Sequence, residues 1–170
     1  YQDQNNQPSP SCKKCTAGRD APSSTEPCLD CVTGKFQELT TSITYECKFC
    51  SAGTSFDTKA TACSSCPAGK YQEENDALSV VCKFCVAGKE FTTATTVCSI
   101  CGAGKFQNQN DATPAVCGDC PNGRYLTDIV TAEGEHDDES DCLFCVSGKQ
   151  FTLKTTICSI CVAGKYQSQN

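Results

Sequence analysis

The chain has 170 residues, 18 of them cysteine, and its net charge is −6. A cysteine share above about 8–10% is typical of a disulfide scaffold, and an acidic balance argues against a nucleic-acid-binding surface, which would be basic. No apolar run approaches the roughly 20 residues of a membrane span, and none is long enough to build a large hydrophobic core. Because disulfides persist in oxidising compartments, we expect an extracellular protein.

The cysteines form nine CxxC pairs that divide the chain into repeats. The spacers between successive pairs contain 12, 15, 12, 15, 12, 15, 21 and 12 residues, so a short and a long repeat together make a 35-residue period. Such self-similarity is the signature of a repeat array. We therefore expect one continuous array over residues 1–170, in which repeats 1 to 9 begin at Cys12, Cys28, Cys47, Cys63, Cys82, Cys98, Cys117, Cys142 and Cys158.

Every spacer opens with a similar short motif, for example VTGKFQ or PAGKYQ. Its glycine lies three residues after the second cysteine of the pair in all nine repeats, which indicates a positive φ angle or a close approach of another backbone. An aromatic residue follows in most repeats, and we expect each ring to cover a disulfide of its own or the neighbouring repeat. The nine glycines are Gly18, Gly34, Gly53, Gly69, Gly88, Gly104, Gly123, Gly148 and Gly164.

The rest of each spacer predicts short strands and turns. The short spacers are rich in threonine, as in KEFTTATTVC and KQFTLKTTIC, and β-branched residues favour strands. The long spacers carry polar stretches such as QEENDALSVV, which indicate a wide turn that returns to a short strand. No segment shows helical periodicity. The predicted fold is an elongated, solenoid-like rod of small disulfide-rich repeats, made of short β-hairpins and turns, with little or no helix and no large hydrophobic core.

Residues 121–141 in repeat 7 form a longer acidic insert, six residues longer than the other long spacers. Clustered carboxylates can bind Ca²⁺, but the EF-hand pattern is missing and a solvated loop is favoured, so we predict no metal and no other cofactor. The only histidine, His136, is expected to be exposed in this loop, and with no Ser-His-Asp constellation we predict no enzyme activity. The acidic residues are Asp128, Glu133, Glu135, Asp137, Asp138, Glu139 and Asp141.

The two ends resemble halves of one repeat. The final segment VAGKYQSQN lacks a closing cysteine, and the initial segment YQDQNNQPSPSC resembles a spacer without its opening pair. Joining residues 162–165 to residues 1–11 gives 15 residues, the length of a long spacer. We therefore expect either one period of a longer array or a subunit that continues head to tail.

Cysteine pairs at this spacing suit disulfides or four-cysteine zinc sites. Nine pairs do not divide evenly into four-cysteine sites, which favours disulfides, and a thioredoxin-type site would need a helix start in a βαβ fold.

Two disulfide patterns remain open. One joins pairs in parallel across a short spacer, as in Cys47–Cys63 with Cys50–Cys66. The other, which we prefer, treats all repeats alike and leaves Cys12 and Cys161 to join neighbouring copies. Its eight consecutive bonds are Cys15–Cys28, Cys31–Cys47, Cys50–Cys63, Cys66–Cys82, Cys85–Cys98, Cys101–Cys117, Cys120–Cys142 and Cys145–Cys158.

The motif CPAGKYQ, followed by a spacer and a further CxxC pair, resembles the ephrin-receptor-like cysteine-rich repeats of large extracellular proteins. The glycine and aromatic positions are also similar to the first submodule of tumour necrosis factor receptor-like domains. The resemblance covers essentially the whole chain, and it implies modular extracellular rods and stalks rather than catalysis.

These features support three hypotheses. The leading one is a structural component of an extracellular filament or cell-surface fibre, in which copies associate head to tail and also side by side through strand edges. The alternatives are a ligand-binding or stalk region of a cell-surface receptor, and a zinc-binding module. Serine and threonine content also permits O-glycosylation, with candidates at Thr92, Thr93, Thr95, Thr96, Thr155 and Thr156.

Overall fold

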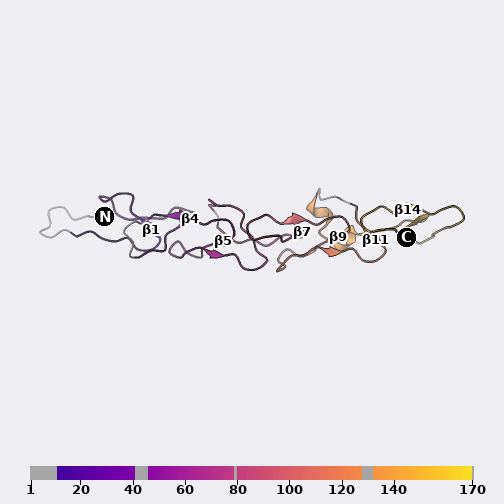
Figure 1. Cartoon of the computed structure of the whole chain (residues 1–170), viewed down its shortest axis with the longest axis horizontal. Coiled ribbons are helices and arrows are strands. Elements are labelled where there is room, and N and C mark those ends of the chain that lie inside the picture. Colours follow the sequence, from indigo (N-terminus) through magenta and orange to yellow (C-terminus); the bar gives the residue numbers. More distant parts are fainter. Residues whose placement is uncertain (1–10, 41–45, 79, 128–131, 170) are drawn as a thin grey trace. The chain divides into compact units, whose positions relative to one another are not determined.

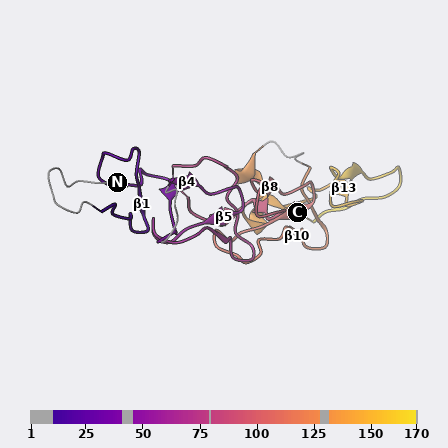
Figure 2. The same ribbon diagram turned by 60° about the vertical axis from the view of Figure 1, so that its left-hand side comes forward.

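The computed structural model describes residues 11–40, 46–78, 80–127 and 132–169. Within these residues there is no α-helix, and the regular β-structure consists of seven two-stranded antiparallel hairpins with long loops between them (Figures 1 and 2). The predicted class, a disulfide-rich fold of short hairpin repeats, is confirmed. The hairpins are β1 (Arg19–Asp20) with β2 (Leu29–Asp30), β3 (Lys35–Phe36) with β4 (Lys48–Phe49), β5 (Thr54–Ser55) with β6 (Ser64–Ser65), β7 (Lys89–Glu90) with β8 (Ser99–Ile100), β9 (Lys105–Phe106) with β10 (Gly118–Asp119), β11 (Arg124–Tyr125) with β12 (Leu143–Phe144), and β13 (Lys149–Gln150) with β14 (Ser159–Ile160).

Every hairpin has the same construction. Its outgoing strand begins directly after the repeated glycine, and its returning strand consists of the two residues inside the next CxxC pair, as in the register of Lys35 with Phe49. Repeat 4 follows the same plan with a single bridge between Tyr71 and Lys83. Because only two residues separate the cysteines of a pair, only two residues are available as a strand partner.

The strands predicted over the threonine-rich stretches are therefore wrong. In repeat 5 the strand ends at Glu90, and residues 91–98 form loop and turn. In repeat 8 the strand ends at Gln150, and residues 151–158 do the same. Local β propensity does not produce a strand where the fold offers no partner backbone to pair with.

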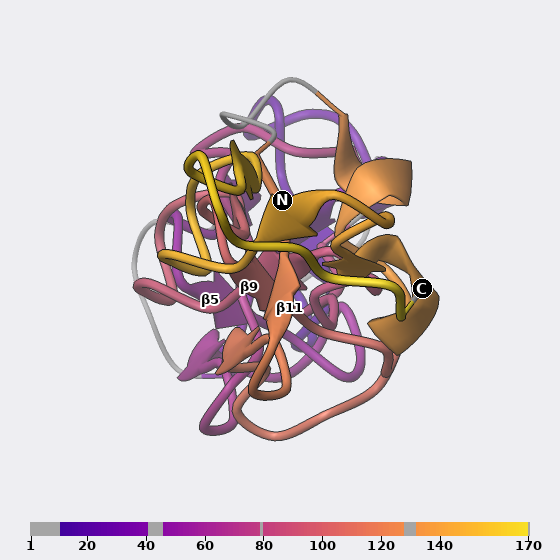
Figure 3. The same ribbon diagram turned by 90° about the vertical axis from the view of Figure 1, so that its right-hand side faces the viewer.

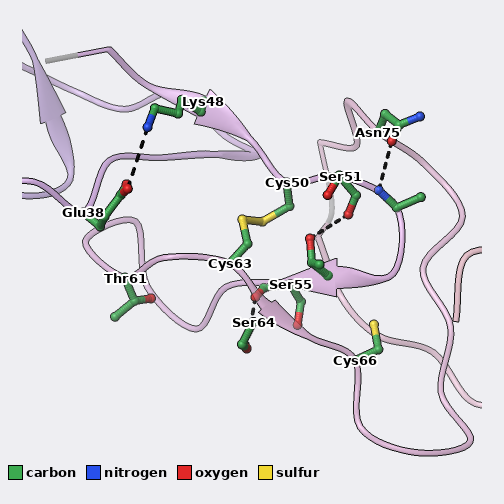
Figure 4. The surroundings of a disulfide bond; sticks show 12 residues. Glu38, Lys48, Cys50, Ser51, Ser55, Thr61, Cys63, Ser64, Cys66 and Asn75 are labelled. Atoms are coloured by element: carbon green, nitrogen blue, oxygen red, sulfur yellow. Dashed lines mark hydrogen bonds and ion pairs between the residues drawn. A yellow bond between two sulfur atoms is a disulfide. The ribbon is translucent and has the colours of Figure 1, made fainter. Parts of the chain in front are cut away.

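Seven disulfides close the seven hairpins, and an eighth, Cys66–Cys82, closes the bridged loop of repeat 4. Each joins the second cysteine of one pair to the first cysteine of the next, which is the consecutive pattern rather than the parallel one. Figure 4 shows one of them, Cys50–Cys63, beside the β5–β6 hairpin. Cys12 and Cys161 are the two free cysteines.

Small clusters of disulfides and aromatic rings take the place of a large core. Phe36 and Cys50 belong to one buried cluster, and Tyr71 and Phe91 pack against another, which contains Cys85 and Cys98. The expectation that rings cover disulfides is met in these clusters. The small size of each cluster leaves the covalent bonds as the main constraint on the fold.

The chain divides into two compact units. The first comprises Tyr1–Pro67, Gln72–Cys82 and Ala94–Thr96, and it contains the hairpins up to β5–β6. The second comprises Ala68–Tyr71, Lys83–Thr93 and Val97–Asn170, and it contains the hairpins from β7–β8 onward. Among the described residues, no helix has the length and apolar character needed to cross a bilayer.

The acidic insert folds locally into two single-turn 3-10 helices, η1 (Glu133–Glu135) and η2 (Glu139–Asp141), drawn in orange in Figure 3. A capping box starts η2. The Asp138 carboxylate accepts a hydrogen bond from the Ser140 N–H at 2.8 Å, and the Asp138 N–H donates to the Asp141 carboxylate at 2.9 Å. Asp128, which the sequence assigned to the acidic insert, lies outside the described residues, as do residues 1–10 of the initial half-repeat.

The capping box gives a pH-dependent prediction. The hydrogen bond from the Ser140 backbone N–H, with a second bond to the Ser140 side chain, lowers the pKa of Asp138. A lowered folded-state pKa means that the cap stabilises η2 above the unfolded pKa of about 3.9 and is lost as the pH falls through the folded value. We expect the amide proton shift of Ser140, followed by NMR, to titrate with a midpoint below that of an aspartate in an unstructured peptide.

The matched control is Asp138→Asn, which keeps a capping oxygen and removes the titrating group. This variant should retain η2 and show no titration at Ser140. A wild-type midpoint at or above the unstructured value would contradict the capping geometry.

Candidate functional site

In five of the nine repeats, the repeated glycine makes backbone hydrogen bonds to the next repeat. We call the segment from the second cysteine of a pair to the residue after the glycine the glycine turn. All nine glycines have φ between +74° and +85°, which confirms the positive-φ prediction. In repeat 3 the Gly53 N–H donates to the Gln72 carbonyl at 2.7 Å, and the Gly53 carbonyl accepts from the Cys66 N–H at 2.8 Å.

In a second kind of contact, the glycine turn of one repeat is covered by residues of the repeat two positions later in the chain. The turn of repeat 2 lies so close to repeat 4 that a Cβ on Gly34 would be 2.5 Å from the Ala77 carbonyl oxygen. A Cβ on Gly88 in repeat 5 would be 2.1 Å from the Glu133 carbonyl oxygen in repeat 7. Close approach is thus a second reason for glycine, in addition to φ.

Six glycine turns follow this rule, three in each compact unit. In every case the covering residues belong to the spacer of the repeat two positions later, so the contact forms a regular second-neighbour stack. The contacts pair Gly18 with Lys59 and Ala60, Gly34 with Ala77 and Leu78, Gly53 with Ala94 and Thr95, Gly69 with Thr113 and Pro114, Gly88 with Glu133, and Gly104 with Lys154.

The last three glycine turns are uncovered. A Cβ on Gly123, Gly148 or Gly164 would meet no atom of the described residues within 4 Å, and Gly148 and Gly164 are exposed. The same part of the chain exposes large apolar side chains, and nine of the 17 large exposed apolar residues lie between residues 143 and 166. Tyr166 is 89% exposed, whereas Phe36 at the same position of its repeat is 7% exposed.

Buried glutamines occupy the same position in repeats 2, 4 and 6. Gln37, Gln72 and Gln107 all lie three residues after the glycine, and all three are buried. The Gln107 side-chain amide donates to the Lys89 carbonyl at 3.1 Å and to the Val86 carbonyl at 3.4 Å. Its side-chain oxygen accepts from the Gln109 N–H. These contacts tie a long repeat to the strand of the repeat before it.

Sequence reasoning missed these glutamines. The signal was present, because glutamine follows the aromatic residue at the same position in four long repeats, the fourth being Gln167. An asparagine three residues later shows the same periodicity: the Asn75 side-chain oxygen accepts from the Ala52 N–H at 3.0 Å (Figure 4), and that of Asn110 accepts from the Ala87 N–H at 2.9 Å. A polar residue at a fixed place in a repeat indicates a repeated hydrogen bond.

The prediction that His136 is exposed is wrong, because its side chain is fully buried. Its Nδ1 lies 2.9 Å from the Lys105 carbonyl oxygen, and its own carbonyl accepts from the Gln107 N–H at 2.9 Å. In repeats 2 and 4 the corresponding N–H groups donate to Lys59 and Ala94. The insert therefore supplies the His136 carbonyl as the hydrogen-bond acceptor. In the other two cases the acceptor is a carbonyl of a short spacer, in repeat 3 or repeat 5.

The acidic residues of the insert are not gathered into a metal site. Among the described residues, no group of three or more His, Cys, Asp or Glu side chains is placed to hold a metal ion. Lys89 forms an ion pair with Glu133, beside the contact that covers Gly88, and Arg124 pairs with Glu139 at 3.2 Å. At least part of the negative charge thus links the insert to neighbouring hairpins.

The remaining predicted site residues lie at the surface. Cys12 is exposed and Cys161 is half-buried, and no disulfide includes either of them. The six threonines considered for O-glycosylation are all exposed, and they occupy the loops of repeats 5 and 8 (Thr92, Thr93, Thr95, Thr96, Thr155 and Thr156).

The fold and the stack together define a disulfide-rich hairpin-repeat protein with two levels of repeat-to-repeat contact. Comparison with protein-family models gives no match, and no curated protein matches the chain at a significant level. The function must therefore be inferred from the geometry of the stack, the uncovered turns and the two free thiols.

The covered and uncovered turns give a matched mutational test. Gly88→Ala and Gly148→Ala both place a Cβ at positive φ, which costs about 1–2 kcal/mol. The Gly88 variant also forces a Cβ against the Glu133 carbonyl oxygen, and we expect a further loss of about 1–3 kcal/mol. Denaturant unfolding with the disulfides intact measures both values, and equal losses would contradict the second-neighbour contact.

Replacing a buried glutamine tests the side-chain hydrogen bonds. Gln107→Met keeps the length of the side chain but leaves the Lys89 carbonyl and the Gln109 N–H without this partner. We expect the free energy of unfolding to fall by about 1–3 kcal/mol. Gln150→Met, at an exposed position, is the control and should change it by less than about 0.5 kcal/mol. Similar values for the two variants would rule out a structural role for Gln107.

Proposed function

We propose that the chain is a structural component of an extracellular filament or cell-surface fibre, in which copies join head to tail through a disulfide between Cys161 of one copy and Cys12 of the next. The observation that carries this proposal is the disulfide pattern. One rule, second cysteine to next first cysteine, is applied eight times and leaves one thiol in repeat 1 and one in repeat 9. Applied once more, it joins Cys161 to Cys12 of another copy.

Head-to-tail contacts of this kind generate filaments. The two surfaces that meet are different parts of the molecule, so each joined copy presents a new free surface of each type. Unless the rotation between copies closes a ring, the assembly continues without limit. The repeat construction supports this arrangement, because every internal repeat already joins its neighbour through the same bond.

The chemistry of the junction suits an extracellular setting. Formation of the disulfide releases two protons and two electrons from the two thiols to an oxidant such as molecular oxygen. Sixteen of the 18 cysteines are already paired in the eight disulfides, and such density is typical of secreted proteins. Oxidation of Cys12 and Cys161 requires the same oxidising conditions as the formation of the eight internal disulfides.

Two further features support a fibre component. The hairpins have only two strands each, so their outer edges are available for side-by-side pairing between copies. The exposed threonines of the loops in repeats 5 and 8 provide positions for O-linked glycans, which would add a solvated coat.

Electron microscopy and non-reducing electrophoresis test the proposal. Wild-type protein, oxidised at high concentration, should form filaments and a ladder of disulfide-linked oligomers that collapses on reduction. Cys12→Ser and Cys161→Ser should each abolish the ladder when tested alone. Discrete monomeric particles from the wild-type protein would instead favour the receptor-stalk alternative.

Mixing the two variants tests the head-to-tail direction. Cys12→Ser protein retains Cys161 and Cys161→Ser protein retains Cys12, so only the mixture can form the proposed bond. We expect linked dimers from the mixture and monomers from each variant alone. Linked dimers from either variant alone would show head-to-head joining and contradict the proposal.

A further inference from the structure

We propose that the uncovered glycine turn of Gly148 is a docking position for a second copy of this chain. Residues Ser24 and Thr25 of the second copy cover the turn. This inference rests on the proposed head-to-tail association and names the non-covalent contact that orients it. The template for this contact is the second-neighbour stack within the chain, in which six glycine turns are each covered by residues of the spacer two repeats later.

The turn of Gly148 is already built like the covered turns. Its φ is +80°, against +85° for Gly18 and +81° for Gly53. Its N–H donates to the Gln167 carbonyl at 2.8 Å, and its carbonyl accepts from the Cys161 N–H at 2.9 Å. The covered turns of Gly18, Gly53, Gly88 and Gly104 make the same two bonds. Only the covering spacer is missing, so the position is preorganised for one.

The surroundings of this turn are those of an unfilled contact. A groove of about 370 Å³ lies beside it, lined by residues that include Phe144, Lys149 and Phe151. Of the aromatic residues that line the groove, Phe144 is 56% exposed and Phe151 is 37% exposed. Burying this apolar surface against a covering spacer would favour association.

The register of the stack identifies the covering residues. Over the turns of repeats 1, 3 and 6, the covering spacer is a short one, and its contacts are the sixth and seventh residues after its own glycine. These are Lys59 with Ala60, Ala94 with Thr95, and Lys154.

The repeat two positions after repeat 8 is repeat 1 of the second copy, if Cys161 joins Cys12. Its spacer is short, and the sixth and seventh residues after Gly18 are Ser24 and Thr25. Both are exposed, and the Ser23 side chain bonds the Thr25 hydroxyl at 3.1 Å within their own loop. They are small, as Ala60 and Ala94 are, so they can approach a glycine turn closely.

The main test fills the docking position. Asparagine tolerates positive φ better than most residues, so Gly148→Asn should fold while its side chain occupies the space that the second copy would enter. At equal protein and oxidant concentrations, we expect the variant to form the Cys12–Cys161 ladder at least 10-fold more slowly than wild type. The matched control is Gly102→Asn. A Cβ on Gly102 would also meet no atom within 4 Å in the described part of the chain, but Gly102 is not one of the nine glycines with positive φ. This variant should form the ladder at the wild-type rate.

The outcomes separate this inference from the proposed function. A normal ladder from Gly148→Asn would overturn the docking position and leave the head-to-tail disulfide standing. A wild-type protein that forms no ladder would overturn both.

A second measurement approaches the contact from the other copy and does not depend on the stability of the asparagine variant. Within the chain, a Cβ on Gly53 would be 3.7 Å from the Ala94 Cβ, inside the range of about 3.5–4.5 Å that a disulfide needs. Gly148→Cys protein mixed with Ser24→Cys protein should therefore form a disulfide between the two introduced thiols, detected by peptide mass mapping. Gly102→Cys mixed with Ser24→Cys should not, and equal yields in the two mixtures would contradict the proposed register.

Discussion

The disulfide from the second cysteine of one pair to the first cysteine of the next is the constraint on which this fold depends. The strands are two residues long, and the buried clusters contain only a few side chains each, so neither hydrogen-bonded sheet nor apolar burial is extensive. A bond that closes a loop of about 15 residues restricts the unfolded chain by about 3 kcal/mol in the entropic account. This bond recurs eight times along the chain.

The glycine turns add the longer-range contact. Covalent bonds connect each repeat with its first neighbour, whereas the backbone packing over glycine connects it with its second neighbour. Six of the nine glycine turns have this second-neighbour contact, three within each compact unit. The side-chain amides of Gln37 and Gln107 donate to the carbonyls of Arg19 and Lys89 in the preceding repeats, and a buried carbonyl without a partner would cost about 1–3 kcal/mol.

The acidic insert shows how the stack accommodates an irregular repeat. Its η1 turn brings the Glu133 backbone over Gly88 and the His136 carbonyl to the Gln107 N–H. The additional residues therefore lengthen the path without removing either contact. The charged side chains that made this segment appear to be a solvated loop also include Glu133, which pairs with Lys89.

The sequence by itself determined the repeat period, the hairpin class, the positive φ of the glycines and the absence of a large core, because these depend on local spacing and composition. It left the disulfide pattern open between two schemes, since the spacing of Cys47, Cys50, Cys63 and Cys66 suits both. Only the tertiary structure decided the second-neighbour stack, the burial of Gln107 and His136, and the loss of strand in the threonine-rich loops. Each of these depends on which backbone lies opposite a residue. The residues in contact are 18 to 50 positions apart in the chain, so no local signal marks the contact.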